Sequence, residues 1–347
     1  MKKELVMQEL PVDFCHASTI ALLEDGSLAC AWFGGSREGN PDVAIYFAKR
    51  NAEGQWTAPQ KLIDGPEANW NPVLLVQQGE LWLFCKQGQE IKDWKTLIIK
   101  SLDGGITWSL PKELVHGDIS GGRGPVRNKC LIAANGRLLA GCSTERGIWQ
   151  AYADYSDDAG ISWEKSGAIA IEGLTYAQGE KTAESSIAVS EQSFYGRGVI
   201  QPSLWESAPG RLHMLLRSSE GYVYRADSED NGTTWSAAYA LELPNNNSGL
   251  DVVRAPWNGR LYLLCNPVAA NWGRRSPLTL LESADNGYSW KRILDLETAP
   301  EEFSYPCLIC AGGEAAGEKT DQNRLIMSYT YGRRNIALIE LTENELS

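Results

Sequence analysis

Six polar residues stand at the beginnings of strands in a repeated pattern, and they could carry out acid–base chemistry if the fold brings them together. They are His16, Asn71, Asn128, Gln201, Asp251 and Tyr305. Imidazole, carboxyl and phenol groups can give or take a proton in catalysis. His16 is one of only three histidines in the 347-residue chain. These six positions therefore mark a candidate reaction site.

Arginines and carboxylates follow the next strands of the same pattern. The segments "SREGNPD", "STERG", "LLRSSEG", "WGRRSP" and "YGRRN" supply Arg37, Asp42, Glu145, Arg217, Arg274, Arg275, Arg333 and Arg334. A guanidinium fork binds a carboxylate through two parallel hydrogen bonds. Trp94 and Trp149 follow two of these strands and offer flat faces for a sugar ring. The inventory suits a small acidic saccharide as the ligand.

Composition and charge exclude several other classes of partner. A chain with net charge −12 repels nucleic acids and anionic membranes. No segment is apolar for long enough to form a signal peptide or a membrane span, so we expect a cytoplasmic protein. The eight cysteines lack metal-type spacing and suit a reducing compartment. The segment "GGRGP" lacks the Lys-Ser/Thr ending of a phosphate loop, and we expect neither a metal nor a cofactor.

Four short segments share the spacing S-x-D-x-G-x-[ST]-W. They are "SLDGGITW" (101–108), "SDDAGISW" (156–163), "SEDNGTTW" (228–235) and "SADNGYSW" (283–290). The Asp can accept backbone N–H bonds within its own turn, and the Gly permits a positive φ. We interpret these Asp boxes as hairpin turns in which the Asp is structural and not catalytic.

A longer repeat consists of a strand, a turn containing Gly and a second strand. Its six copies begin at residues 16, 71, 128, 201, 251 and 305. Six all-β repeats of this kind predict an all-β fold, a six-bladed β-propeller that occupies residues 1–347 as a single domain. The last copy lacks a box, and we expect the N-terminal strand near "ELVMQEL" to complete its blade and close the ring.

A propeller would place the candidate residues at one mouth of its central channel. The inner strands begin, and the second strands end, on one face of the disc, whereas the Asp boxes lie on the other face. We therefore expect the six strand-opening residues and the arginine-bearing loops to form one polar pocket for an anionic ligand. The expected binding residues are Arg37, Asn71, Glu145, Gln201, Arg217, Asp251 and Arg275.

With these residues in place, the sequence resembles the sialidase (neuraminidase) superfamily, in its bacterial Asp-box branch. The resemblance extends over nearly the whole chain and implies roles for particular residues. It implies that Asp42 in "SREGNPD" is an acid/base group, and that Arg217 and Arg275, in preference to Arg274, bind the substrate carboxylate. It also implies that Tyr305 in "FSYPCL" is the nucleophile, because a carboxylate nucleophile would be repelled by the acidic sugar.

Two positions depart from the family pattern. The family has an Arg-Ile-Pro arginine where this chain has His16 in "CHAST", and a Tyr-activating Glu where this chain has Gln201 in "IQPSL". A neutral imidazole cannot form a carboxylate fork, and an amide cannot take the phenol proton. These departures weaken the expectation of ordinary sialidase chemistry but leave the expectation of a pocket unchanged.

Three functions remain open from the sequence. The first is a sialidase-like exo-glycosidase in which Asp42 and Tyr305 are catalytic and His16 or Glu145 replaces the missing base. The second is a lyase on uronic-acid glycans, with His16 and Tyr305 as base and acid. The third is a non-catalytic propeller that binds acidic glycans.

Overall fold

The chain folds almost entirely into β-strands. The structure is a computed structural model that describes residues 2–120, 122–179, 181–183, 191–313 and 323–346. Within these ranges the helical elements are three short 3-10 helices, η1 (Ile91–Asp93), η2 (Glu191–Phe194) and η3 (Glu343–Leu346). No helix in the described part of the chain is both long and apolar enough to cross a membrane.

Antiparallel pairing divides the strands into groups of four, which we call blades 1 to 6 in chain order. Blade 1 consists of β2 (Phe14–Leu22), β3 (Leu28–Gly35), β4 (Ala44–Arg50) and β5 (Gln60–Ile63). Blade 2 consists of β6 (Asn69–Gln77), β7 (Glu80–Gln87), β8 (Lys95–Ser101) and β9 (Lys112–Glu113). Blade 3 consists of β10 (Leu131–Ile132), β11 (Leu138–Arg146), β12 (Ile148–Ser156) and β13 (Glu164–Lys165).

The second half of the chain repeats this plan. Blade 4 consists of β14 (Arg197–Ala208), β15 (Arg211–Ser218), β16 (Tyr222–Ser228) and β17 (Tyr239–Pro244). Blade 5 consists of β18 (Asp251–Arg254), β19 (Leu261–Cys265), β20 (Leu278–Ser283) and β21 (Lys291–Glu297). Blade 6 consists of β22 (Phe303–Ala311), β23 (Arg324–Tyr331), β24 (Asn335–Thr342) and β1 (Lys2–Leu5).

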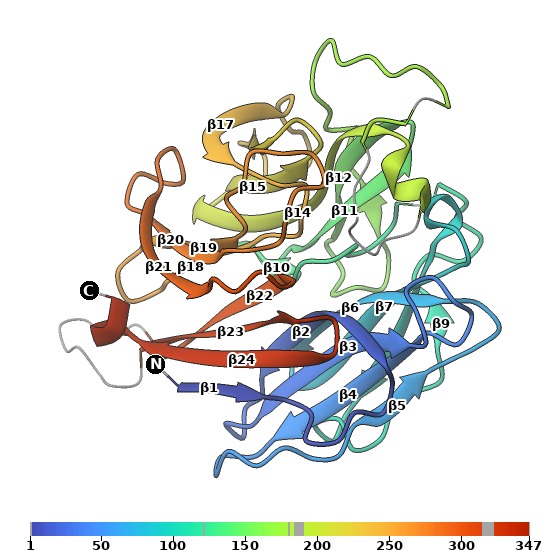
Figure 1. Cartoon of the computed structure of the whole chain (residues 1–347), viewed down its shortest axis with the longest axis vertical. Helices are drawn as coiled ribbons and strands as arrows, with labels where there is room; N and C mark the ends of the chain where they lie inside the picture. The colour runs from blue at the N-terminus through green and yellow to red at the C-terminus, as the bar shows by residue number, and fades with distance from the viewer. Residues whose placement is uncertain (1, 121, 180, 184–190, 314–322, 347) are drawn as a thin grey trace.

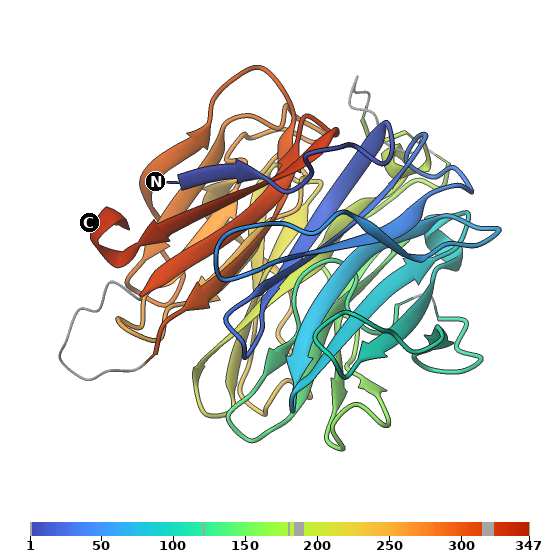
Figure 2. The same cartoon turned by 90° about the horizontal axis from the view of Figure 1, so that it is seen from below.

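The blades follow one another around a common centre, as expected of a propeller (Figure 1). Blades 3 and 4 are joined into one sheet because β12 and β14 pair in parallel over two residue pairs. The ring closes where β1, the first strand, pairs with β24, the last. Figure 2 shows these two strands side by side, with the two termini on the same side of the molecule. The expected N-terminal closing strand is therefore present.

The Asp boxes are structural turns, as predicted. In the first box, Asp103 accepts hydrogen bonds from Ser101 Oγ (2.8 Å) and Thr107 N (2.9 Å), and Trp108 Nε1 donates to the Gly105 carbonyl (3.1 Å). The other three boxes repeat these bonds. The Trp108 ring packs edge-on against Phe47 of the preceding blade, 5.4 Å between centroids. Each box thus closes its own hairpin, and the first box also packs onto its neighbour.

The inner strands of four blades share a bulge near the same end. At this bulge one residue adopts a positive φ, namely Ala17 (54°), Asn71 (46°), Gln201 (55°) or Tyr305 (53°). Non-glycine residues rarely adopt this conformation, and the cost is tolerated mainly at functional sites. The equivalent of Asn71, Gln201 and Tyr305 is therefore Ala17, so the expected register is wrong by one residue in blade 1: His16 precedes the bulge residue.

Candidate active site

Tyr305 lies at the centre of a cluster of buried arginines. It sits on β22, and its side chain is buried against Gly249, where an added Cβ would lie 3.2 Å from the tyrosine Cγ. Arg217 Nη1 donates a hydrogen bond to the phenolic oxygen at 2.7 Å. The guanidinium carbons of Arg127 and Arg275 each lie 5.3 Å from the ring centroid. Cations over an aromatic face are attracted by its quadrupole, so the ring and the arginines stabilise one another.

His16 packs directly against Tyr305. The two ring centroids are 4.2 Å apart, and His16 is only 1% exposed. Its Nδ1 is 2.9 Å from the Thr330 hydroxyl. Burial lowers the pKa of His16 well below its usual value, and the charge of Arg333, followed by those of Arg275, Arg127 and Arg217, lowers it further. At neutral pH the imidazole is therefore uncharged, and its surroundings disfavour protonation.

Gln201 and Asn247 hold the arginine that contacts Tyr305. Arg217 Nε donates to Asn247 Oδ1 at 2.9 Å, and its Nη1 also donates to Gln201 Oε1 at 3.2 Å. The resemblance expects at position 201 a carboxylate that would deprotonate the tyrosine. Here the amide oxygen fixes the guanidinium, so the polar partner of the phenol is a cation and not a base.

Glu302 joins two further arginines beside His16. Its Oε1 accepts from Arg275 Nη1 (2.6 Å) and Ser304 Oγ (2.8 Å), and its Oε2 accepts from Arg333 Nε (2.7 Å). Burial alone would raise the pKa of Glu302, but Arg275 and Arg333 outweigh it and bring the pKa to about 2. Arg333 also pairs with Glu38. Glu302 is therefore a permanent anion that braces two guanidinium groups.

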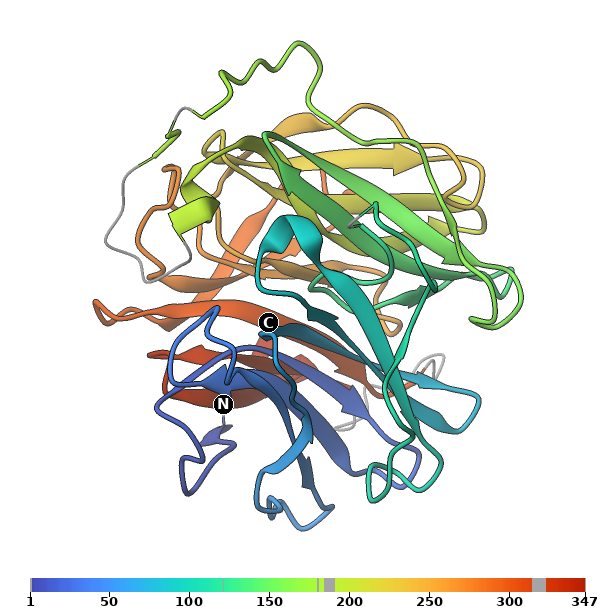
Figure 3. The same ribbon diagram turned by 90° about the vertical axis from the view of Figure 1, so that its right-hand side faces the viewer.

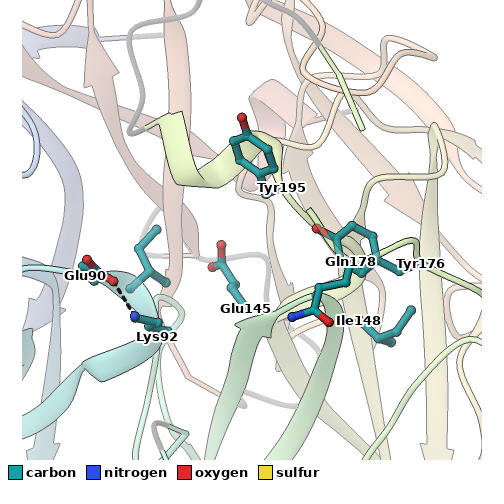
Figure 4. A pocket seen from close by; sticks show the side chains of 9 residues that line it. Glu90, Lys92, Glu145, Ile148, Tyr176, Gln178 and Tyr195 are labelled. Carbon is teal, nitrogen blue, oxygen red and sulfur yellow. Dashed lines mark ion pairs between the residues drawn. The ribbon is translucent and has the colours of Figure 1, made fainter. Parts of the chain in front are cut away.

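Glu145 stands in an open cavity of about 610 Å³ that is also lined by Ile91, Gly147 and Ile148. In Figure 4 its carboxyl group lies between the Glu90–Lys92 ion pair (2.8 Å) on one side and Tyr176, Gln178 and Tyr195 on the other. Burial raises the pKa of Glu145 to about 7, although Arg217 lowers it in part. A carboxyl group with such a pKa can both give and take a proton near neutrality.

The wall with Tyr176 and Tyr195 comes from the long connection between β13 and β14. In Figure 3 the green part of this connection arches beyond the strands, and η2 lies just before β14. Tyr176 covers Gly147, where an added Cβ would come within 3.1 Å of the ring. Because Gly147 has a φ of +67°, a side chain there would be strained as well as obstructed.

The remaining predicted residues are not all gathered at Tyr305. Arg37 and Asp42 are exposed on the loop between β3 and β4, where Asp42 accepts hydrogen bonds from the Ser36 N–H and hydroxyl, both at 2.9 Å. Asn71 is buried at the bulge of blade 2, and Asn128 donates to the Gln201 carbonyl at 2.9 Å.

The carboxylate of Asp251 is bound by groups from neighbouring inner strands and from Lys129. Both its oxygens accept from Lys129 Nζ at 2.7 Å, and it also accepts from the Ser203 hydroxyl and from the Leu308 N–H. Asp251 therefore ties the inner strands of blades 4, 5 and 6 together with its oxygens fully engaged.

Sequence reasoning missed Arg127, Glu302 and Asn247. Arg127 immediately precedes Asn128 in "GPVRNKC", and Glu302 lies three residues before Tyr305 in "EEFSYP", so both are close in sequence to predicted residues. Asn247, in the loop before β18, had no comparable signal.

The sequence contains two pairs of adjacent arginines, Arg274–Arg275 and Arg333–Arg334. In these pairs Arg275 and Arg333 are buried, whereas Arg274 and Arg334 are exposed. Within the described residues, no three His, Cys, Asp or Glu side chains gather as metal ligands would.

Comparison with known proteins supports this architecture. A family model described as a BNR repeat-like domain matches residues 26–316. A Dyadobacter fermentans protein of unknown function has a TM-score of 0.72 at 16% identity, covering 99% of this chain and 98% of its own. The Hadza microbial sialidase Hz136 has a TM-score of 0.72 at 17% identity, over 95% of this chain and 66% of that one.

The Trypanosoma rangeli sialidase has a TM-score of 0.70 at 14% identity, over 98% of this chain and 56% of that one. No curated protein matches the sequence. At these identities the solved structures establish a common fold, while the family model covers most of the sequence itself. The chain therefore belongs to the BNR repeat-like domain family and has the propeller fold of the sialidase superfamily.

Proposed function

We propose that this protein is an enzyme that hydrolyses the glycosidic bond of a carboxylate-bearing sugar, a sialic acid or a related acidic sugar, in the pocket around Tyr305. The observation that carries the proposal is the buried phenol that accepts from Arg217 at 2.7 Å while Arg127 and Arg275 flank its ring. A buried group of cations without equal acidic partners requires an anion. An acidic sugar supplies that anion.

In this reaction Tyr305 attacks the anomeric carbon or stabilises the positive charge that develops there. Arg217 would stabilise the developing phenolate, and the neutral His16 beside the ring would receive the phenolic proton. A neutral phenol avoids the repulsion that a carboxylate nucleophile would meet from the sugar's own carboxylate. Water would then release the sugar and regenerate the tyrosine.

Two carboxyl groups compete for the role of proton donor to the leaving oxygen. Asp42 is the donor that the family resemblance implies, but it is exposed and bonded to Ser36. Glu145 has a pKa of about 7 and lies in the cavity that could receive the leaving group. We assign the proton transfer to Glu145, with Asp42 as the alternative that mutagenesis separates.

A lyase acting on uronic-acid glycans is the second candidate. It is favoured by the uncharged His16 packed on Tyr305, together with the absence, among the described residues, of a carboxylate hydrogen-bonded to the phenol. His16 would remove the proton next to the uronate carboxylate, Tyr305 would protonate the leaving oxygen, and the arginines would neutralise the uronate.

The experiment is a screen of the purified protein against sialosides and uronic-acid oligosaccharides, with Tyr305→Phe and the exposed Tyr288→Phe compared. Hydrolysis yields a free reducing sugar, whereas elimination yields an unsaturated product that absorbs in the ultraviolet. We expect turnover that falls at least about 100-fold in Tyr305→Phe and is unchanged in Tyr288→Phe. Binding of an acidic sugar without turnover of its glycosides would instead identify a non-catalytic binder.

A further inference from the structure

We propose that Ser207, His213 and Asp227 form a second catalytic site, a serine triad that hydrolyses esters of small carboxylic acids. Ser207 sits at the opposite end of β14 (Arg197–Ala208) from Gln201, about 20 Å away along the strand. The triad therefore lies on the side of the Asp boxes and not at Tyr305. The proposal goes beyond glycoside hydrolysis and does not depend on it.

Two hydrogen bonds connect the three side chains in the order that a serine triad requires. Ser207 Oγ lies 2.7 Å from His213 Nε2, and His213 Nδ1 lies 2.5 Å from Asp227 Oδ1. An ionised carboxylate can only accept, so it fixes the N–H of the imidazole at Nδ1 and leaves Nε2 to accept the serine proton. A triad is identified by these contacts and not by the order of its residues in the sequence.

The sheet of blade 4 places the three residues together. His213 on β15 stands directly opposite Trp205 on β14 and Asp227 on β16, so the three side chains are neighbours on one face of the sheet. The Trp205 ring stacks on the imidazole, with 4.9 Å between centroids. The pairing of β14 with β15 shifts register at Ser207, and such a bulge redirects a side chain.

Asp227 is held as an anion that orients the imidazole. Its Oδ1 accepts from Arg225 Nε at 2.8 Å, and its Oδ2 accepts from the Tyr239 hydroxyl at 2.6 Å. Burial alone would raise the pKa of Asp227, but the hydrogen bonds from His213, Tyr239 and Arg225 outweigh it and bring the pKa to about 2. Arg225 Nη2 also lies 3.0 Å from His213 Nδ1, so the guanidinium contacts both partners.

Asn286, in the Asp box of blade 5, supplies a donor for the oxyanion. Its Nδ2 lies 3.2 Å from His213 Nε2, and its Oδ1 accepts from Trp205 Nε1 at 2.8 Å, which turns the amide N–H groups toward Ser207. Once Nε2 has taken the serine proton, it can no longer accept from Asn286. The amide is then free to donate to the oxygen on which negative charge develops.

The reaction is an acyl transfer to the serine followed by hydrolysis. Ser207 Oγ bonds to the ester carbonyl carbon as its proton passes to His213 Nε2, and the carbonyl oxygen becomes an oxyanion beside Asn286. Collapse of this intermediate breaks the bond to the alcohol oxygen, which takes the proton from His213. Water then attacks the acyl-serine, His213 again relays the proton, and the carboxylic acid leaves.

The surroundings of Ser207 favour a small acyl group. Ser207 and Asn286 are both half-buried, so the reacting groups lie at the surface of a hairpin. An acyl group such as acetyl can be held there between the serine and the amide, while the alcohol part of the ester remains in solvent.

The test combines hydrolysis of p-nitrophenyl acetate by the full chain with labelling by a fluorophosphonate, which bonds to a nucleophilic serine with loss of fluoride. We expect kcat/KM to fall at least about 100-fold in Ser207→Ala, and the label to be found on Ser207. Ser109→Ala, a change in an exposed serine of blade 2, should alter neither result.

Two further variants test the supporting groups. Asn286→Gly removes the amide but tolerates the positive φ of 59° at this position, and it should lower kcat at least about tenfold. Asp227→Asn should slow the labelling of Ser207, because the imidazole loses the acceptor that fixes its N–H at Nδ1. Thermal unfolding checks the folding of each variant.

Hydrolysis no faster than in buffer, equal rates in Ser207→Ala and the unaltered protein, or a label on any other residue would overturn the proposal. Ser207→Ala removes one oxygen from a half-buried side chain, so a loss of activity at unchanged Tm reports the chemistry and not the fold. Ester and glycoside hydrolysis are assayed with different substrates, so failure of one activity leaves the other standing.

Discussion

At the scale of single residues, His16 and Tyr305 pack against each other among buried arginines. The imidazole is kept neutral by burial and by four arginines, and the phenol takes its hydrogen bond from Arg217. Neither contact reproduces the arginine and the glutamate that the family pattern expects at positions 16 and 201. The polar groups next to one another at this site are therefore a neutral histidine and a tyrosine bound by a cation.

The depressed pKa of His16 predicts a loss of stability in acid. In the unfolded chain the His16 imidazole takes up a proton below about pH 6.5, whereas in the folded chain it does so only at lower pH. The contribution of His16 to the free energy of unfolding is therefore fully present above about pH 6.5 and decreases as the pH falls. We expect His16→Gln to reduce the difference in unfolding free energy between pH 8 and pH 5 by up to about 2 kcal/mol. Urea unfolding at the two pH values measures this, with the exposed His116→Gln as control. An identical pH dependence in both variants would contradict the account.

Glu145 predicts an opposite pH dependence. Its folded-state pKa of about 7 exceeds the ordinary value of 4.5, so its burial costs stability as the pH rises from 4.5 through 7. Glu145→Gln should therefore raise the unfolding free energy at pH 8 by about 1–3 kcal/mol, with no gain at pH 4. The same substitution should lower kcat at least about 100-fold and remove the alkaline limb near pH 7. If Asp42→Asn lowers kcat more than Glu145→Gln does, Asp42 is the proton donor.

Much of this residue-scale environment could be foreseen and some could not. Five residues could be predicted because each lies at a recognisable repeat position or strand end: His16, Gln201, Arg217, Arg275 and Tyr305. The sequence did not indicate that Glu302 and Arg127 belong to the site. Their place in it depends on contacts with side chains of other blades, which the sequence does not show. The ion pair of Asp251 could not be predicted either, because its partner Lys129 comes from another blade.

At the scale of elements, the bulge in the inner strands determines which side chains lie near Tyr305. A positive φ at Asn71, Gln201 and Tyr305 interrupts the alternation of the strand, so the neighbouring residues are displaced from the simple two-residue pattern. Sequence periodicity assumes a regular strand, which explains why the register of blade 1 was misjudged by one residue. The Asp boxes, by contrast, are purely local, and their spacing alone sufficed to predict them.

The boxes should affect stability without affecting catalysis. Asp285 accepts hydrogen bonds from Ser283 Oγ, Ser289 N and Ser289 Oγ, and these bonds lower its pKa to about 2. Asp285→Ala should lower the Tm by about 1–3 °C, because a turn loses its acceptor in a large domain. The kcat/KM of the same variant should stay within about twofold of the unaltered value. A large loss of activity at unchanged Tm would show that the boxes take part in the reaction.

At the scale of the whole molecule, the last blade is completed by the first strand. β1 pairs with β24 over four residue pairs, and Val6 and Met7 are buried in the core that follows. The sequence predicted this closure because the last repeat lacks an Asp box. The closure also matters for the pocket, since the chain leaves β1 and leads directly to Phe14 and His16.

Removal of the closing strand should destabilise the ring as a unit. We expect deletion of residues 2–9 to lower the Tm by at least about 5 °C, because the edge of β24 becomes exposed and apolar side chains lose their burial. Differential scanning calorimetry measures this effect. A transition at an unchanged temperature would show that β1 contributes little to the integrity of the ring.

We propose that the site around Tyr305 binds the carboxylate of an acidic sugar. The most direct measurement is a crystal structure of the protein soaked with the acidic sugar that binds best. We expect the sugar ring to lie against Tyr305 and His16, with its carboxylate hydrogen-bonded to Arg217 and Arg275. A sugar bound elsewhere, or one bound in this pocket with its carboxylate directed into solvent, would contradict the account.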